Sequence, residues 1–535
     1  MNRFKSSLTM LSLALVAGPV LMAQEATGAL TGTVRDRKGN PVEGVEVRIT
    51  APTLQGARTI FTDSKGIYRA PLLPPGSAYS ISLRKEGYVG ASATGIGVNV
   101  SQTSRQDLLM EATSASATVE VSDNKASVDK TNTSSQTTIT SETFDVLPGT
   151  TRGMADAALR APGVTAGGFT DGGRLSIRGQ QGFGTRFLLN GVDIADNVFG
   201  GTNGRNSYYV DDSIAEIQVI QSPINAKYGG FSGGVIQAVS KSGSNSFSGT
   251  IRANVSRTAW SAISPMGQRF DRTNGRPAPG TDLQSAEYTV FIGGPIIQDK
   301  LWFTASTILS PAAYSSGTFS NPTGTSLQTS AMAVYGWNGG LSGASYIFPT
   351  AGQQFTTVSA NQFYDMKLTY AINQDHSLEL QSNRAVTAQQ NRNYTSTMDP
   401  RNLVPQTNLN EYQTLAYRGV LSSNTTLEAR YGYKNQNLSA GGDPALGDVI
   451  GSYYGASFST YFSHNGIFNK SDGGDARIIK TYTANLNHFL NDGPLGSHNF
   501  DLGFEMLRQS RAAANDQSPT GSIIYNAGYN ANGTF

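Results

Sequence analysis

The sequence contains no cysteine, only four histidines and only 15% charged residues. Without cysteine the chain can form no disulfide, no thiolate metal site and no lipidated N-terminal cysteine, and it has no thiol nucleophile. The formal net charge is +2 and no basic stripe stands out, so nucleic acid is not expected as a partner. These absences exclude several common classes of binding site and catalytic site.

Long apolar runs are missing as well. After the first thirty positions, no stretch of about eighteen residues is both apolar and uncharged, which excludes a helical membrane protein. A transmembrane β-barrel remains open, because its strands alternate apolar and polar residues and keep the mean hydropathy low. Glycine (60) and tyrosine (23) are abundant, and a length of 535 residues predicts several domains.

Residues 1–23 have the order of a secretory signal peptide. Two basic residues precede an apolar stretch that ends at Ala23, where cleavage is expected. A membrane anchor is the alternative. It is disfavoured because the stretch is short and contains a Gly-Pro pair at positions 18–19. The sequence therefore predicts export.

Residues 24–112 read as a small β-sandwich. Apolar and polar residues alternate at 30–34 and 45–49, on either side of a turn at 36–41. The segment resembles the carboxypeptidase regulatory-like domain, which has a transthyretin-like sandwich fold, and the resemblance carries no peptidase chemistry. The segment contains no histidine, so a zinc site made of histidine and carboxylate cannot be built there.

Residues 136–243 carry three short motifs in a fixed order: LSIRGQ from Leu175, RFLLNGVDI from Arg186, and YGGFSGGVIQ from Tyr228. Their apolar stretches are too short for ordinary helices, and their glycines permit tight turns. The order resembles the plug domain of TonB-dependent outer-membrane receptors, although Asn190 replaces the usual Asp and Gln237 the usual Asn. A glycine-rich soluble β domain is the alternative. The matching residues are Arg178, Gly179, Asn190, Gly191, Tyr228, Gly229, Gly233 and Gly234.

Residues 113–135 have the Ser- and Thr-rich composition of a linker. The resemblance implies a segment before the plug, the TonB box, that pairs by strand addition with the periplasmic protein TonB. The β-prone candidate consists of Thr118, Val119, Glu120 and Val121. An ordinary linker or the first plug strand is the alternative.

Residues 230–234 match the G-x-S-x-G pattern of a hydrolase nucleophile elbow. That elbow needs a helix after the serine and a histidine partner. A β-prone run follows instead, and all four histidines lie far downstream. We interpret the segment as a turn, and we expect no catalytic residue, cofactor or metal in the chain.

Residues 244–535 alternate apolar and polar side chains in segments of roughly ten residues. Short connections alternate with long polar ones, which is typical of an outer-membrane barrel with tight periplasmic turns and long external loops. A soluble sandwich would alternate as well, so the connections carry this interpretation. Nine strands are predicted, near residues 246–258, 285–294, 301–310, 362–372, 378–386, 411–421, 425–434, 480–490 and 498–509. Bacterial barrels have an even number of strands and no open edge, so we expect the sequence to stop partway round the barrel.

The expected fold is mainly β: a signal peptide, a transthyretin-like β-sandwich, an α+β plug and part of an antiparallel transmembrane β-barrel. The resemblance implies a TonB-dependent receptor of the Oar-like type in the outer membrane, with sandwich and plug facing the periplasm. Its partners would be TonB, outer-membrane lipid and a ligand such as a siderophore, oligosaccharide or peptide. A secreted or surface-anchored all-β adhesin is the alternative.

The plug motif adds one expectation about packing. Arg178 follows an apolar strand, and a guanidinium enclosed by a barrel requires a partner because an unpaired buried charge costs several kcal/mol. We expect it to pair with one of the acids predicted inside the barrel: Asp365, Glu428 or Glu505. An exposed arginine at a strand end is the alternative.

Overall fold

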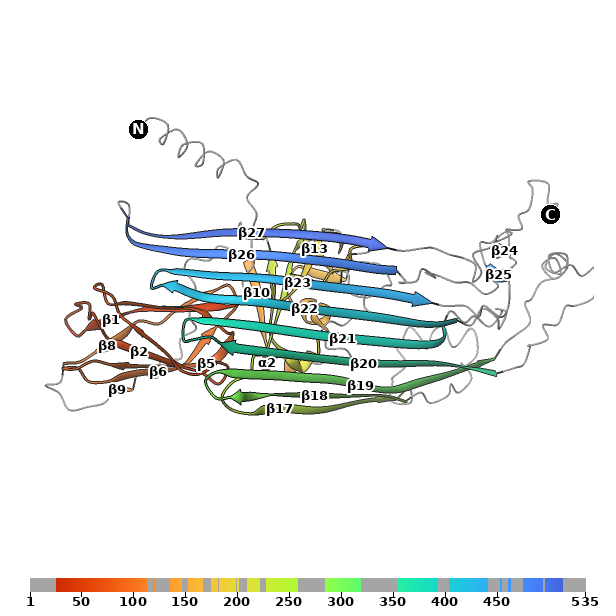
Figure 1. Ribbon diagram of the computed structural model, residues 1–535, viewed down its shortest axis with the longest axis horizontal. Coiled ribbons are helices and arrows are strands. Elements are labelled where there is room, and N and C mark those ends of the chain that lie inside the picture. Colours follow the sequence, from red (N-terminus) through yellow and green to blue (C-terminus); the bar gives the residue numbers. More distant parts are fainter. Residues whose placement is uncertain are drawn as a thin grey trace, which may run out of the picture.

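The computed structural model describes most of the chain between residues 26 and 512 (Figure 1). The described ranges are 26–112, 119–120, 135–146, 153–166, 175–180, 182–198, 200–201, 209–221, 228–257, 284–318, 354–392, 404–440, 453–454, 460–462, 475–493 and 496–512. The predicted signal peptide, Thr118 and Val121 lie outside these ranges. Among the described residues, no helix is long and apolar enough to cross a membrane.

Residues 26–112, together with the short strand at 119–120, form a two-sheet sandwich, hereafter the sandwich. In one sheet, β1 (Gly28–Asp36) pairs with β4 (Ile67–Leu73), β7 (Thr103–Arg105) and β8 (Leu108–Met110). The other sheet has the order β3-β2-β5-β6-β9, with the bounds β2 (Glu46–Thr50), β3 (Arg58–Phe61), β5 (Gly76–Arg84), β6 (Ala91–Val98) and β9 (Val119–Glu120). Alternate residues of both sheets face one core that includes Leu30, Val47, Tyr68, Tyr79 and Ile81. The predicted β-sandwich is confirmed.

The described residues between 135 and 243 form an α+β unit, hereafter the central domain. Its sheet has the order β10-β15-β16-β13-β14, with the bounds β10 (Ser135–Thr140), β13 (Thr185–Leu189), β14 (Val192–Asp193), β15 (Ile214–Gln221) and β16 (Gly234–Ser240). Two short helices, α2 (Ser141–Val146) and α3 (Met154–Ala158), and the hairpin of β11 (Val164–Ala166) with β12 (Leu175–Ile177) accompany it. β15 and β16 are buried along almost their whole length.

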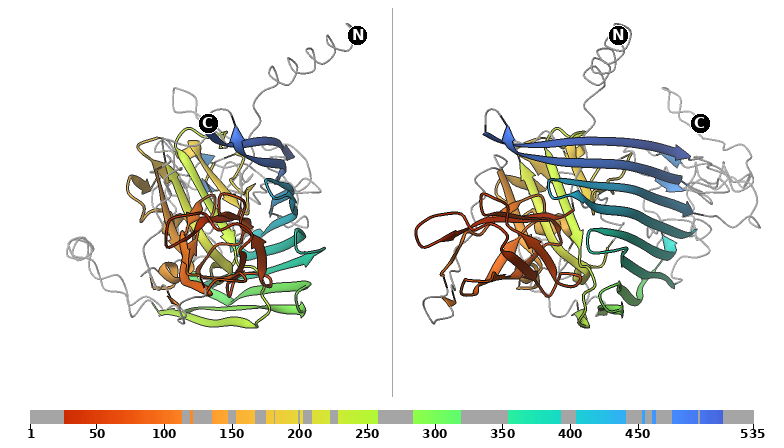
Figure 2. Two further views of the ribbon diagram at one scale, coloured as in Figure 1. Left: turned by 90° about the vertical axis from the view of Figure 1, so that its left-hand side faces the viewer. Right: turned by 60° about the vertical axis from the view of Figure 1, so that its left-hand side comes forward.

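Most of the remaining described chain forms one antiparallel sheet of nine strands in sequence order, and β24 (Tyr453–Tyr454) pairs separately with β25 (Thr460–Phe462). Its strands are β17 (Ser248–Arg257), β18 (Gln284–Ile297), β19 (Leu301–Thr318), β20 (Gln354–Ala371), β21 (His376–Arg392), β22 (Val404–Ser422), β23 (Thr425–Ala440), β26 (Asp475–Gly493) and β27 (Gly496–Ala512). Each coincides with one of the nine predicted strands, but most are longer than expected, up to 19 residues in β22. Figure 2 shows the sheet curving around one side of the central domain.

The two faces of this sheet are the reverse of those of a soluble protein. On β20, Tyr364 and Met366 are 50% and 49% exposed, whereas Asp365 and Lys367 between them are 4% and 2% exposed. Leu502 of β27 is 62% exposed. Apolar side chains therefore cover the convex face, and polar side chains turn toward the central domain. A contiguous apolar outer face of this kind is what a transmembrane barrel wall presents to lipid.

Candidate functional site

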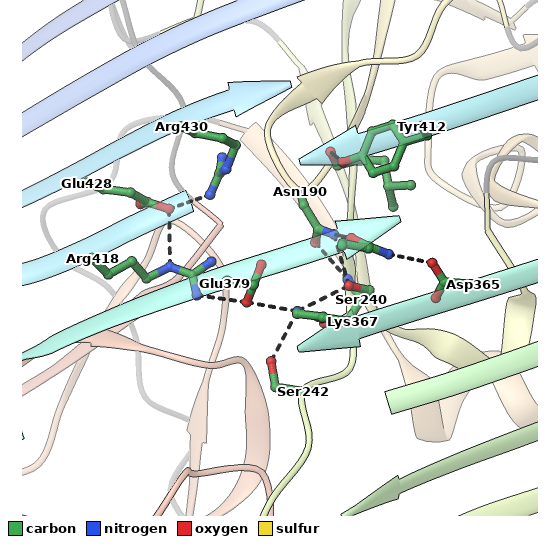
Figure 3. A network of polar contacts seen from close by, with 12 residues as sticks. Asn190, Ser240, Ser242, Asp365, Lys367, Glu379, Tyr412, Arg418, Glu428 and Arg430 are labelled. Atoms are coloured by element: carbon green, nitrogen blue, oxygen red, sulfur yellow. Dashed lines mark hydrogen bonds and ion pairs between the residues drawn. The ribbon is translucent and has the colours of Figure 1, made fainter. Parts of the chain in front are cut away.

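The candidate site is the buried seam between the central domain and the polar face of the nine-stranded sheet (Figure 3). Lys367 of β20 lies at its centre. Its ammonium contacts Glu379 at 3.1 Å, Ser242 Oγ at 3.2 Å and Ser240 Oγ at 3.3 Å. One cation thus joins two strands of the sheet to the end of β16.

From Glu379 the ion pairs continue along the sheet. Glu379 contacts Arg418 of β22 at 3.0 Å, Arg418 contacts Glu428 of β23 at 3.3 Å, and Glu428 pairs with Arg430. The side chains of these residues are at most 14% exposed. Charges alternate in sign along the chain, so each buried ion faces an opposite one, as a water-poor site requires.

Asn190 connects the central domain to the same seam. Its amide nitrogen donates to Ser240 Oγ at 2.9 Å and to Gln381 Oε1 of β21 at 2.6 Å, and its oxygen accepts from the Ser240 N–H. The Asn190–Gly191 pair has φ values of +47° and +74°, the left-handed turn for which Asn-Gly is favoured. An aspartate here could accept but not donate, so the departure from the family pattern suits this site.

Arg186 of β13 makes a further long-range contact with the sheet and was not identified from the sequence. Its guanidinium binds Glu505 of β27 at 3.0 and 2.5 Å, Asp193 at 3.0 Å and the Gly229 carbonyl at 2.9 Å. Burial opposes the charge, but the carboxylates of Glu505 and Asp193 more than offset this and raise the pKa of Arg186. The only sequence signal was a charged residue entering the apolar strand Phe187–Leu189, which by itself fixes no partner.

The expectation that Arg178 is enclosed and paired is wrong. Its side chain is exposed, and its backbone has φ +53° in the turn directly after β12. The chain reverses there, so Ile177 points into the core while Arg178 points away from it. The acids proposed as its partners do face inward, but Glu505 binds Arg186, Glu428 binds Arg418 and Arg430, and Asp365 accepts from Gln381.

A second set of cations holds the loop after β14. Arg477 of β26 contacts Asp196 at 2.6 Å and Asp475 at 2.5 Å, and Lys434 of β23 donates to the Ala195 carbonyl at 2.8 Å. On the other side of the central domain, Arg252 of β17 contacts Asp212 at 2.7 Å. The central domain is therefore fastened to strands at both ends of the described sheet.

The glycine-rich segment before β16 makes a close approach possible. A Cβ on Gly234 would lie 2.8 Å from Ile177 Cδ1 and from the Ile220 carbonyl, so only glycine fits between β12 and β15. Next to it, the Ser232 N–H donates to the Gly184 carbonyl, and a Cβ on Gly233 would crowd Gln180 and Thr185. After this turn the chain enters strand β16 rather than the helix that a nucleophile elbow would need.

Within the candidate TonB-contact segment, the structure describes Val119 and Glu120. They form β9, which pairs in parallel with β6 at Ala91 and Ser92. Thr118 and Val121 lie outside the described residues. Within the described ranges, no group of three or more His, Asp or Glu side chains could hold a metal ion.

A curved sheet with an apolar outer face and a globular domain ion-paired to its polar inner face defines a class: membrane barrel walls that carry a domain in the lumen. Comparison with known proteins specifies the family. Residues 29–111 match the carboxypeptidase regulatory-like domain, and residues 128–235 match the TonB-dependent receptor plug domain. These matches support a TonB-dependent receptor with an N-terminal regulatory-like domain, and the central domain corresponds to the plug, the name used for it below.

One curated relative is the TonB-dependent transporter Oar of Myxococcus xanthus, 28% identical over 391 residues. The match covers 70% of this chain and 35% of the relative, so the chain spans about a third of that protein's length. Among solved structures, the outer-membrane transporter YddB of Escherichia coli has a TM-score of 0.49 at 16% identity, covering 70% of this chain and 48% of that one. The ferric enterobactin receptor PfeA of Pseudomonas aeruginosa has a TM-score of 0.46 at 17% identity, covering 71% and 50%.

Proposed function

We propose that this chain acts in the TonB-driven uptake of a large or scarce nutrient across the outer membrane. The observation that carries the proposal is the seam, where buried ion pairs and hydrogen bonds hold the central domain against the sheet. Among the described residues, the apolar clusters shared across the seam are small: Tyr412 joins the core of the central domain, and Val210 packs with Phe363 and Ala385. Polar contacts of this kind can be exchanged for contacts with water at a modest net free-energy cost, whereas a continuous apolar core cannot. The seam therefore suits a domain that is closed at rest and remodelled during transport.

In this proposal the signal peptide, residues 1–23, directs export, and the sandwich and central domain face the periplasm. The support for this orientation is that the sandwich lies at the end of the sheet where the short turns occur (Figure 1). Lipid contacts the exposed apolar side chains, and the external loops bind ligand. TonB binds by strand addition at 118–121 and pulls on the linker. The transport step requires no covalent chemistry.

The proposal allows three classes of ligand. One similar structure is a ferric enterobactin receptor, which makes a ferric siderophore one candidate, and oligosaccharides and peptides are the others. The chain has 23 tyrosines and only 15% charged residues, and this composition suits each of the three ligand classes. Aromatic rings can stack on sugars and on catecholate rings alike.

Membrane fractionation tests the localisation. The full-length protein is expected in the outer-membrane fraction, to require detergent for extraction, and to migrate faster on gels when unheated, because a closed barrel resists unfolding by detergent. A soluble or surface-shed protein with no heat-dependent shift would contradict the proposal and favour an all-β adhesin.

A further inference from the structure

The main contact between the sandwich and the central domain is made by one turn, residues 98–102, which joins β6 to β7. Val100 at its tip is 1% exposed. Its N–H donates to Glu216 Oε1 at 3.2 Å, and its carbonyl accepts from Gln218 Nε2 at 2.6 Å. Glu216 and Gln218 lie two residues apart on β15 and therefore on one face of that strand. They hold both backbone groups of Val100 as a neighbouring strand would.

The side chains around the turn complete the contact. Val100 packs with Ala26 and with Val239 of β16, and the Tyr228 hydroxyl donates to Ser101 Oγ at 3.2 Å. Ser101 has φ +54°, a left-handed conformation that costs a non-glycine residue free energy. The surrounding contacts thus hold the turn in a strained shape that presents Val100 to β15.

Two outer contacts extend the interface to both sides of the seam. Ser77 Oγ donates to Glu142 of α2 at 3.1 Å. The Arg69 guanidinium lies 3.0 Å from the centre of the Phe489 ring, at the turn end of β26, in a cation–π contact. The sandwich therefore touches the central domain and the sheet that surrounds it.

The polar side chains at this contact indicate that the sandwich can dissociate from β15 and bind again. The rest of β15 consists mainly of Ile and Val, yet the two residues under the turn are Glu216 and Gln218. A permanent core would place apolar side chains there, whereas these two regain water if the sandwich leaves. Burial also raises the pKa of Glu216 to about 7, so the docked state keeps this carboxyl in an unfavourable environment.

We propose that the sandwich is a reversible latch: through the turn 98–102 it grips β15 and holds the plug in place against the sheet. The inference rests on the proposed function only in treating the plug as the element that must move. It assigns to the regulatory-like domain a mechanical role that requires no ligand and no catalysis.

Thiol labelling in outer-membrane vesicles tests the latch, because residues 1–535 contain no cysteine that would compete with an introduced one. In the full-length protein, Val100→Cys is expected to react with a maleimide-polyethylene glycol about tenfold or more slowly than Lys38→Cys, an exposed position of the same sandwich. Adding Glu216→Ala and Gln218→Ala should bring the Val100→Cys rate close to the control and leave Lys38→Cys unchanged. Equal rates without the alanines, or no effect of the alanines, would overturn the latch.

A second reporter tests whether the latch holds the plug. Val192, 0% exposed, lies at the seam, where a Cβ on Gly432 of β23 would clash with it. Val192→Cys is expected to react slowly and to become several-fold faster in the Glu216→Ala, Gln218→Ala background. An unchanged rate would mean that the sandwich is attached to the plug without restraining it. Neither experiment involves TonB, so a failed latch and a failed proposed function give different results.

Discussion

Arg186 of the plug and Glu505 of β27 form a two-point ion pair, with nitrogen–oxygen distances of 3.0 and 2.5 Å, although 319 positions separate them in the sequence. Both side chains are at least nine-tenths buried, and Asp193 binds the remaining edge of the guanidinium. The planar fork of arginine matches a carboxylate in a way that lysine cannot reproduce. This pair therefore fixes the position of the plug against β27 more specifically than a surface ion pair could.

Arg186→Ala should destabilise the docked plug by about 3–5 kcal/mol, because it leaves Glu505 and Asp193 buried without their partner. The measurement is urea unfolding of the protein in detergent, followed by a fluorophore on the plug. The double variant Arg186→Ala, Glu505→Ala should lose clearly less than the sum of the single losses. Strictly additive losses would show that the two side chains do not depend on each other.

Lys367→Met should loosen the seam, because methionine keeps the length of the side chain but cannot bind Ser240, Ser242 or Glu379. The expected result is greater sensitivity of cells to large antibiotics that a closed plug excludes, at unchanged protein abundance. Two matched controls should have no effect. Lys480→Met changes a lysine of β26 that lies on the face of the sheet turned away from the plug, and Arg178→Ala changes an arginine whose side chain is exposed. Unchanged sensitivity in Lys367→Met would contradict a structural role for this cation in the seam.

Binding of the sandwich turn 98–102 to β15 should weaken as the pH rises. Burial raises the pKa of Glu216 from 4.5 to about 7, so the docked state binds more protons than the undocked state between these values. Docking is therefore strongest below about pH 4.5 and loses this contribution as the pH passes through 7. Labelling of Val100→Cys should be several-fold faster at pH 8 than at pH 5, after correction for the reactivity of a free thiol. Glu216→Gln, which cannot ionise, should flatten the dependence, and a pH response that persists in it would point to another group.

The sandwich should fold by itself. Its core of buried residues is drawn from both of its own sheets, so a fragment of residues 26–112 is expected to unfold in one cooperative transition and to hydrolyse no peptide bond. Circular dichroism during thermal unfolding and a peptidase assay with added zinc measure both properties. Zinc-dependent cleavage by the purified fragment would contradict the non-catalytic interpretation.

The nine strands could be predicted because alternation is a local property, set by residues two apart on the same strand. The same alternation predicted correctly that Asp365, Glu428 and Glu505 face inward. It could not show what lies opposite them, since that depends on how the plug is oriented within the sheet. Arg178 and Arg186 illustrate the difference: both adjoin short apolar strands, but only the second points toward the sheet. The left-handed backbone at Arg178 that turns its side chain outward is set by the tight turn after β12, which the motif alone does not reveal.

The contact between the sandwich and the plug could not be predicted from the sequence either. Val100 contributes backbone atoms rather than a distinctive side chain, so no motif marks it. Glu216 and Gln218 interrupt an apolar strand, and this is the one local sign that their face meets a polar partner.

The most direct test of the central claim, that TonB drives this receptor through its linker, is photo-crosslinking in living cells. A photoreactive amino acid at position 119 of the full-length protein should form an adduct with TonB, identified by mass spectrometry. The adduct should be lost when the neighbouring Glu120 is replaced by proline, which removes a backbone donor that strand addition needs. The same photoreactive residue at position 38 of the sandwich should give no TonB adduct. Failure to capture TonB from any linker position between 113 and 134, in cells where the protein reaches the outer membrane, would contradict the account.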